Sequence, residues 1–423
     1  MEYRFSDKIA SLKPSAIREV LKATSVPGMI PFAAGNPAPD AFPVAEVREI
    51  TADILASRPI EALQYGVTEG YHELVGLIRE RMKSKYNIGR SFDSILVTSG
   101  AQQVMDLSTK VLCNEGDVVI CESPSFIGSL NCFRSYNAKI VGVPMEADGM
   151  DIEALEKALD ENPNAKMIYT IPNFQNPAGV TMSLEKRKKL YELAKAHGVM
   201  ILEDNPYGDL RVAGEDVPNI KSFDEDGIVI YSGSFSKILA PGIRIGFTVA
   251  PAPIAAKMTV GKQAVDVHTT QLMQMVVAEW MKRYDVDEHI EKIREIYRRK
   301  LNLMCDMIDS ELGDAVSYVR PEGGLFIWCE LPEDIDAICV KTTAYRVYDL
   351  ANTLLRGDAG QAFTLSRALI RDGEEPLFLL ALLQGECRRM LAVKLLRGAG
   401  MQPDAIAGKI GAPPFAVRQM YQQ

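Results

Sequence analysis

The residues best suited to chemistry lie in one short segment, Ile228–Gly246 (IVIYSGSFSKILAPGIRIG). Lys237 follows a hydrophobic run that is typical of a buried strand, and a lysine amine can form an imine with an aldehyde. Ser234 and Ser236 stand beside it and Arg244 follows, and hydroxyl and guanidinium groups bind phosphate. The segment therefore predicts a site for a molecule that carries both an aldehyde and a phosphate.

A strand-to-helix turn supplies a second half for this phosphate site. The string ILVTSGAQQ runs from an expected strand through Ser99 and Gly100 into a helix, which leaves free backbone N–H groups at a helix N-terminus. Every strand-to-helix turn has such N–H groups, so this turn indicates a phosphate site only in combination with Ser234, Ser236 and Arg244. Pyridoxal phosphate carries both an aldehyde and a phosphate, and these residues predict it as the cofactor.

Side chains at three other strand ends fit the ring of such a cofactor. Asp204 follows a hydrophobic run, where a carboxylate can pair with a pyridinium nitrogen; capping of the next loop is the alternative. Asn176 and Tyr207 can contact the phenolic oxygen of the ring, and turn chemistry is the alternative for Asn176. Phe126 can stack on the ring or fill the core. Because separate strand ends each supply one suitable group, the joint pattern favours the cofactor site.

The elements that must position these residues alternate along the chain. Helix-period segments lie at residues 101–112, 152–159 and 184–196. Strands are expected at residues 94–98, 118–122, 139–144, 166–171, 199–203, 228–232 and 244–250. Strands and helices at this spacing predict an α/β fold with a mostly parallel sheet between helices.

Changes of texture divide the 423 residues into four expected parts. These are an N-terminal arm (residues 1–44), a large cofactor-binding domain (45–252), interdomain helices with a partial small domain (253–334), and an all-α domain (335–423). A strand pair is expected within AVSYVR and GGLFIWCEL, and no strand is visible after about residue 334.

Composition limits the classes of function. The net charge of −9 gives no reason to expect binding to nucleic acid or to an anionic membrane, and no apolar run approaches membrane-spanning length. The seven cysteines are scattered without a CxxC pair, which indicates reduced thiols and a cytoplasmic protein. The four histidines pair with no cysteine or carboxylate at ligand spacing, so no metal is expected.

Residues 1 to about 332 resemble the class I/II aminotransferases of the fold-type-I pyridoxal-phosphate enzymes. They are most similar to the branch that includes 2-aminoadipate and kynurenine aminotransferases. The strings that carry the resemblance are FAAGNPAPDAFP, LQYGVTEGYHEL, VTSGAQQ, ESPSF, PNFQNPAG, EDNPYGDL, SGSFSKILAPGIRIG and PEGGLFIW. The resemblance implies amino transfer between an L-amino acid and a 2-oxo acid, and a homodimer.

The resemblance also implies roles for single residues. Lys237 would bind the cofactor aldehyde covalently, Asp204 would pair with the pyridine nitrogen, and Asn176 and Tyr207 would contact the ring hydroxyl. The phosphate would be held by Gly100, Ala101, Gln102, Ser234, Ser236 and Arg244, with Tyr65 reaching the phosphate of the neighbouring subunit. Gly35, Asn173 and Tyr65 would lie near the substrate.

The last quarter of the chain departs from this family. No string matches the family segment whose arginine grips the substrate carboxylate, so the small domain is expected to be truncated and transamination weak or absent. The tail instead resembles the C-terminal helical domain of the bacterial DNA polymerase III delta subunit, which indicates a chimera with a seam near Leu331–Ala337. The alternative function is therefore an interaction protein whose tail pairs with clamp-loader-type partners.

Overall fold

The structure is a computed structural model that describes residues 5–10, 35–330, 366, 391–410, 417 and 421. The chain divides into two compact units, Met1–Glu330 and Leu331–Gln423, and each is described by itself.

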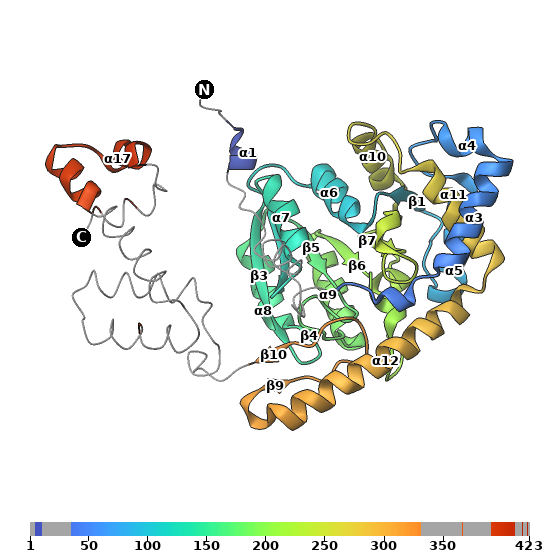
Figure 1. Ribbon diagram of the computed structural model, residues 1–423. Helices are drawn as coiled ribbons and strands as arrows, with labels where there is room; N and C mark the ends of the chain where they lie inside the picture. Colours follow the sequence, from blue (N-terminus) through green and yellow to red (C-terminus); the bar gives the residue numbers. More distant parts are fainter. Residues whose placement is uncertain are drawn as a thin grey trace. The chain divides into compact units, whose positions relative to one another are not determined.

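Eight strands of the described part of the first unit form one sheet (Figure 1). They are β1 (Asp93–Thr98), β2 (Val118–Ser123), β3 (Lys139–Glu146), β4 (Gly149–Met150), β5 (Ala165–Thr170), β6 (Met200–Asp204), β7 (Val229–Ser234) and β8 (Gly246–Pro251). Their order is β1-β8-β7-β6-β5-β2-β3-β4. The neighbours β3, β2, β5, β6 and β7 run parallel, whereas β8 is antiparallel to both β1 and β7. The predicted mostly parallel sheet is confirmed.

The three helices predicted at residues 101–112, 152–159 and 184–196 begin at the predicted residues and end within two residues of the predicted ends. The helices of the first unit are α1 (Asp7–Ala10), α3 (Val44–Ser57), α4 (Pro59–Leu63), α5 (His72–Tyr86), α6 (Ala101–Leu112), α7 (Ile127–Ser135), α8 (Ile152–Glu161), α9 (Leu184–His197), α10 (Ala252–Gln263), α11 (Gln271–Arg283) and α12 (Val286–Glu311). Short 3-10 turns are η1 (Pro39–Ala41), η2 (Gly208–Leu210), η3 (Ile220–Phe223), η4 (Pro241–Ile243) and η5 (Gly313–Ala315). Local capping explains some of these limits: Ser183 accepts from the Lys186 N–H at the start of α9, and Gly198 ends that helix with φ 66°.

Helices cover both faces of the sheet (Figure 1). α6 and α10 pack on each other and on the side of β8, and α7 packs on α6. α8 and α9 pack on each other, and they contact β3 and β6.

The two faces bury alternate residues of the same strands, as a period of two requires. Val119 and Cys121 of β2 belong to one hydrophobic cluster, and Val118 and Ile120 belong to another. Because both faces are buried, the parallel strands are nearly continuous hydrophobic runs, which is why the sequence indicates them so clearly.

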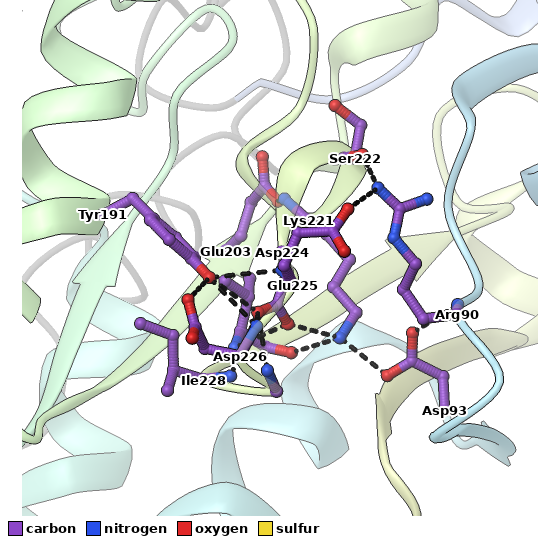
Figure 2. Close-up of polar contacts among 12 residues, drawn as sticks. Arg90, Asp93, Tyr191, Glu203, Lys221, Ser222, Asp224, Glu225, Asp226 and Ile228 are labelled. Carbon is purple, nitrogen blue, oxygen red and sulfur yellow. Dashed lines mark hydrogen bonds and ion pairs between the residues drawn. The ribbon is translucent and has the colours of Figure 1, made fainter. Parts of the chain in front are cut away.

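A buried ion-pair network fixes the amino ends of β1 and β7 (Figure 2). Lys221 Nζ lies 2.7 Å from Asp93 Oδ1 and 2.8 Å from Asp224 Oδ2, and all three side chains are almost completely buried. The same ammonium donates to the Val229 carbonyl at 2.9 Å. This edge of the sheet is opposite to the one where β7 ends at Ser234, so the network stabilises the fold away from the predicted site.

The first unit ends with a strand pair that follows the 26-residue helix α12. β9 (Ser317–Tyr318) pairs antiparallel with β10 (Cys329–Glu330), with Cys329 opposite Tyr318. The strand pair predicted from AVSYVR and GGLFIWCEL is therefore present.

The described residues of the second unit are helical around one small core. Residues 391–398 form a helix, and α17 spans Pro403–Ile410. The buried residues of this described part are Val393, Ile406, Ala407 and, beyond the two helices, Val417. Most of the all-α domain predicted at 335–423, and the seam at Leu331–Ala337, lie outside the described residues.

Candidate active site

A cavity of about 510 Å³ lies where the parallel strands β5, β6 and β7 end. Ligands of open α/β sheets bind at this edge. Eleven of the residues that the sequence assigns to the site line it: Gly35, Ala101, Gln102, Phe126, Asn176, Asp204, Tyr207, Ser234, Ser236, Lys237 and Arg244. The amine and the carboxylate that the cofactor prediction depends on therefore share one cavity.

Lys237 lies in the turn between β7 and η4, with its amine in the cavity. Its Nζ donates to the Gly35 carbonyl at 2.8 Å and lies 5.7 Å from the centre of the Tyr207 ring. Burial, with a smaller contribution from the Arg244 charge, lowers the pKa of Lys237 to about 8. A substantial fraction of the amine is therefore neutral near pH 7 to 8, as a nucleophile or general base requires.

Asp204 ends β6 and is 4% exposed. Its Oδ2 accepts a hydrogen bond from the Tyr169 hydroxyl at 3.0 Å. Its Oδ1 is buried and has no hydrogen-bond partner among the described residues. Burial raises the pKa of Asp204 to about 7. A ligand with a cationic N–H could therefore donate to Oδ1 and, by pairing with the carboxylate, stabilise its charged form.

Asn176 and Tyr207 come together as the sequence predicts for two ligands of one oxygen. The Asn176 amide donates to the Tyr207 hydroxyl at 3.1 Å. Phe326 packs edge-on against the Tyr207 ring with 5.7 Å between the ring centres, and burial raises the pKa of Tyr207. The phenol is therefore protonated at neutral pH and can donate into the cavity.

Three chain segments form a cup suited to phosphate. Ser234 Oγ donates to Ser236 Oγ at 2.9 Å, and the Ser236 N–H donates back to Ser234 Oγ at 3.0 Å. Gly100 precedes the first turn of α6 with φ 79° and ψ 168°, and Arg244 Nη2 donates to the Ser99 carbonyl at 3.2 Å. Hydroxyls, a guanidinium and free N–H groups of a 12-residue helix thus face one place.

A buried ion pair supports the turn before α6. Lys262 Nζ lies 2.8 Å from Asp266 Oδ1, and the Lys262 side chain is fully buried. Asp266 Oδ2 accepts from Ser99 Oγ at 2.7 Å and from Gln103 Nε2 at 2.9 Å. The Ser99 N–H donates to Gln103 Oε1 at 2.8 Å, and the Gly100 N–H donates to the Thr98 carbonyl at 2.8 Å. The turn is therefore fixed by the protein itself, and the N–H groups that can serve the cup are those at the start of α6, from Ala101 on.

The remaining predicted residues lie outside the cavity lining. Tyr65 is 81% exposed and packs edge-on against His268 at 5.7 Å between ring centres. Asn173 is buried, accepts from Arg187 Nη2 at 2.7 Å and donates to Asn205 at 2.8 Å. Gly100 lies directly behind the Arg244 guanidinium.

Sequence reasoning missed several residues of the site. Tyr169, Lys262 and Asp266 contact other residues of the site from outside the cavity, and Ser129 and Trp328 line the cavity itself. Tyr169 follows the buried pattern of β5 and carried no separate signal. The PEGGLFIW string did mark the stretch that contributes Phe326, Ile327 and Trp328.

The donor set fits pyridoxal phosphate on three observations from the structure. The buried Asp204 Oδ1 lacks a partner, Lys237 holds an amine of lowered pKa in the same cavity, and the cup around Gly100 has no room for a Cβ beside Arg244. Each observation corresponds to a different part of the cofactor: ring nitrogen, aldehyde and phosphate.

The comparisons with known proteins agree with this geometry. A profile of the family described as "Aminotransferase class I and II" matches residues 27–367, so the chain belongs to this family. It is a pyridoxal-phosphate-dependent enzyme of the transferase class with the fold-type-I architecture, and its substrates are amino acids and oxo acids. A second profile, described as "DNA polymerase III delta subunit, C-terminal domain", matches residues 344–423, which confirms the resemblance predicted for the tail.

Individual relatives cover about four fifths of the chain. Aromatic-amino-acid aminotransferase 1 of Thermococcus litoralis is 42% identical over 339 residues, covering 79% of this chain and 81% of the relative. The 2-aminoadipate transaminase of Thermus thermophilus is 38% identical, covering 79% and 83%. The crystal structure of Pyrococcus horikoshii kynurenine aminotransferase superposes with a TM-score of 0.76 at 37% identity, covering 82% of this chain and 86% of that one.

Proposed function

We propose that the residues around the cavity carry out amino transfer in the roles that the sequence assigns to them. Lys237 would hold the cofactor, Asp204 its ring nitrogen, Asn176 and Tyr207 its ring hydroxyl, and the cup its phosphate. When bound, pyridoxal phosphate supplies an aldehyde that captures an amine and a ring that stores the electrons of the Cα–H bond. The observation that carries the proposal is one cavity containing Lys237 and the unpartnered Oδ1 of Asp204.

The chain's own groups can move and hold the proton of such a reaction. Lys237 Nζ has its pKa lowered to about 8 by burial, so near neutral pH it can take a proton from a substrate Cα as a general base and then donate it at a different carbon as a general acid. The Gly35 carbonyl, which accepts from this amine at 2.8 Å, fixes its position. The apolar walls, including Phe126 and Phe326, exclude water from the reacting atoms.

We expect the site to bind the carboxylate of its substrate weakly. Among the described residues that line the cavity, the cationic side chains are Lys237 and Arg244, and both are committed to the cofactor in this proposal. A missing bidentate contact to the substrate carboxylate costs on the order of 2–5 kcal/mol, or roughly 30- to 5,000-fold in efficiency. We therefore expect cofactor binding with weak or absent transamination.

The test is capture of the cofactor by the purified full-length chain. Added pyridoxal phosphate should produce a visible absorption band, and borohydride should fix the cofactor on the peptide that contains Lys237. A Lys237→Ala variant should lose the fixed label, whereas Lys189→Ala, which changes an exposed lysine of α9, should retain it. Equal labelling of the Lys237→Ala protein would refute the assignment.

The amino donor can be sought among the substrates named for the relatives. The relatives are an aromatic-amino-acid aminotransferase, a 2-aminoadipate transaminase and a kynurenine aminotransferase. The aromatic walls of the cavity, from Phe126, Tyr207, Phe326 and Trp328, favour donors with aromatic side chains. A screen would begin with tyrosine, phenylalanine, kynurenine and 2-aminoadipate. Turnover equal to that of these relatives would contradict the weakened grip.

The homodimer is supported by an exposed apolar patch beside α4. The patch comprises Ile60, Leu63, Tyr65 and Val67, which are between 61% and 81% exposed. Soluble monomers rarely leave so many neighbouring large apolar side chains in water. We propose that this patch meets a second copy, with Tyr65 reaching the neighbour's phosphate. Sedimentation should give a dimer, and Leu63→Glu should give a monomer with weaker cofactor binding.

Three further predictions stay predictions. The clamp-loader-type partner depends on residues 344–423, most of which lie outside the described part of the chain. A pull-down with the full chain, compared with a chain ending at residue 337, tests it.

The cytoplasmic location remains an inference from the scattered cysteines. Separately, no helix among the described residues is long and apolar enough to cross a bilayer. The four-part domain division likewise remains a proposal.

A further inference from the structure

The two oxygens of the Asp204 carboxylate have different surroundings. Oδ2 accepts from the Tyr169 hydroxyl at 3.0 Å, whereas the buried Oδ1 has no partner among the described residues. Asp204 also lines the cavity. One oxygen is therefore occupied by the protein, and the other is left for a ligand.

Tyr169 is held in place from two directions. It lies on β5 and is fully buried, and its ring packs edge-on against Phe133 with 5.3 Å between the ring centres. Ser129 Oγ donates to the Tyr169 oxygen at 2.9 Å. Ser129 and Phe133 are four residues apart on α7, so one face of this helix fixes both the ring and the hydroxyl of Tyr169.

The hydrogen bonds that join Ser129, Tyr169 and Asp204 all run in one direction. A phenol has one proton, and its oxygen is already an acceptor for Ser129. The Tyr169 proton therefore points to Asp204 Oδ2 and cannot serve another acceptor. The donor chain runs Ser129 to Tyr169 to Asp204 and ends at the cavity.

We propose that Tyr169, fixed by Ser129, is a positioning residue that orients Asp204 so that Oδ1 receives the protonated ring nitrogen of the cofactor. The inference rests on the proposed function, because that function supplies the ring. It assigns to β5 and α7 a task that no local sequence pattern indicates.

The electrostatics of the site explain why such support is needed. Burial raises the pKa of Asp204 to about 7, and the hydroxyl groups of Tyr169 and Ser232 oppose this rise, Tyr169 the more strongly. Among the described residues, the other ionisable groups that interact electrostatically with Asp204 are Glu122 near the end of β2, Tyr207 and Tyr231, and Glu122 raises the cost of a second negative charge. A neutral donor such as Tyr169 stabilises the carboxylate without neutralising it.

The experiment compares two probes on the full-length chain. One probe is pyridoxal phosphate, and the other is its analogue with CH in place of the ring nitrogen, which cannot donate to Oδ1. Tyr169→Phe removes the hydroxyl and keeps the ring. Tyr191→Phe is the matched control, because Tyr191 is buried and donates to Asp226 at 2.7 Å in the network of Figure 2, away from the cavity. Circular dichroism shows whether each variant folds.

Tyr169→Phe should weaken pyridoxal phosphate binding by roughly ten- to a hundredfold, the worth of one hydrogen bond to a charged group. Binding of the analogue should change less than about twofold, since it makes no demand on Oδ1. Tyr191→Phe should leave both dissociation constants unchanged. Ser129→Ala keeps the phenol and should weaken pyridoxal phosphate alone by a few-fold; it carries the test if Tyr169→Phe does not fold.

Two results would overturn the inference while leaving the proposed function in place. One is unchanged binding of pyridoxal phosphate by Tyr169→Phe, and the other is equal weakening for both probes, which would mean a structural role only. Failure of the wild-type chain to bind pyridoxal phosphate at all would overturn the proposed function as well.

Discussion

Replacing Gly100 by alanine tests the phosphate cup at its tightest point. An ideal Cβ on Gly100 would lie 2.1 Å from Arg244 Nη2 and 2.7 Å from Arg244 Cζ. The guanidinium ends a flexible side chain, so it would move away by at least about 1 Å to reach an ordinary contact distance. The clash is thus relieved at the expense of the cup rather than of the fold.

The expected magnitudes separate these two costs. Gly100 has φ 79° and ψ 168°, a conformation that costs a residue with a side chain about 1–3 kcal/mol of folding free energy. Loss of one guanidinium contact to phosphate costs about 1.5–3 kcal/mol of binding free energy, or roughly ten- to a hundredfold in Kd. Gly116→Ala is the matched control: Gly116 has φ 83° and no atom within 4 Å of an added Cβ.

Two assays on the same samples measure these costs. Chemical denaturation of both variants without cofactor should show similar losses of stability. Titration with pyridoxal phosphate should show weaker binding for Gly100→Ala only. If Gly100→Ala bound pyridoxal phosphate within about twofold of Gly116→Ala, Arg244 would not be a phosphate ligand and the cup would be wrongly assigned.

The other predictions concern acidity and buried ion pairs. Because burial lowers the pKa of Lys237 to about 8, the rate of its labelling by an aldehyde and borohydride should increase with pH, with a midpoint near pH 8. A midpoint near the ordinary lysine pKa, about 10.4, would contradict this prediction. The same shift should make the cofactor-free protein more stable as pH rises from 8 toward 10.5, because only the unfolded chain then holds that proton. Lys221→Met leaves Asp93 and Asp224 unpaired in the network of Figure 2 and should lower the free energy of unfolding by about 3–5 kcal/mol. The Kd for pyridoxal phosphate should not change. Loss of cofactor binding by a folded variant would show that this network, at the opposite edge of the sheet, also supports the cavity. Asp266→Asn removes the carboxylate that contacts Lys262 and Ser99. Calorimetry should therefore give a lower Tm, and titration with pyridoxal phosphate should give a higher Kd. An unchanged Kd would show that the phosphate site does not depend on this carboxylate.

The sequence predicts the parallel part of the sheet because buried strands leave a strong local signal. The run before Asp204 is hydrophobic on both faces, and the expected strand at 199–203 becomes β6, Met200–Asp204. The position of β8 between β1 and β7 has no such signal, because its pairing with β1 joins residues more than a hundred positions apart in the sequence. Local pattern thus predicts which strands exist, and tertiary pairing determines where they lie.

The site divides in the same way. Lys237, Asp204 and Arg244 stand at strand ends within recognisable strings, so their chemistry and spacing indicate them. Tyr169 and Lys262 act through other side chains, and their contacts span 35 and 159 residues of sequence. Nothing local distinguishes a tyrosine that supports an aspartate from one that fills a core.

The cavity wall also contains a built-in optical probe. The chain has two tryptophans, Trp280 and Trp328. Trp280 is 1% exposed within the helical core, whereas Trp328 is 40% exposed and lines the cavity. Emission quenched by a chromophore in the cavity therefore comes mainly from Trp328, and emission that shifts on denaturation comes mainly from Trp280. A single fluorescence titration can thus follow occupancy and folding as separate signals, without any attached dye.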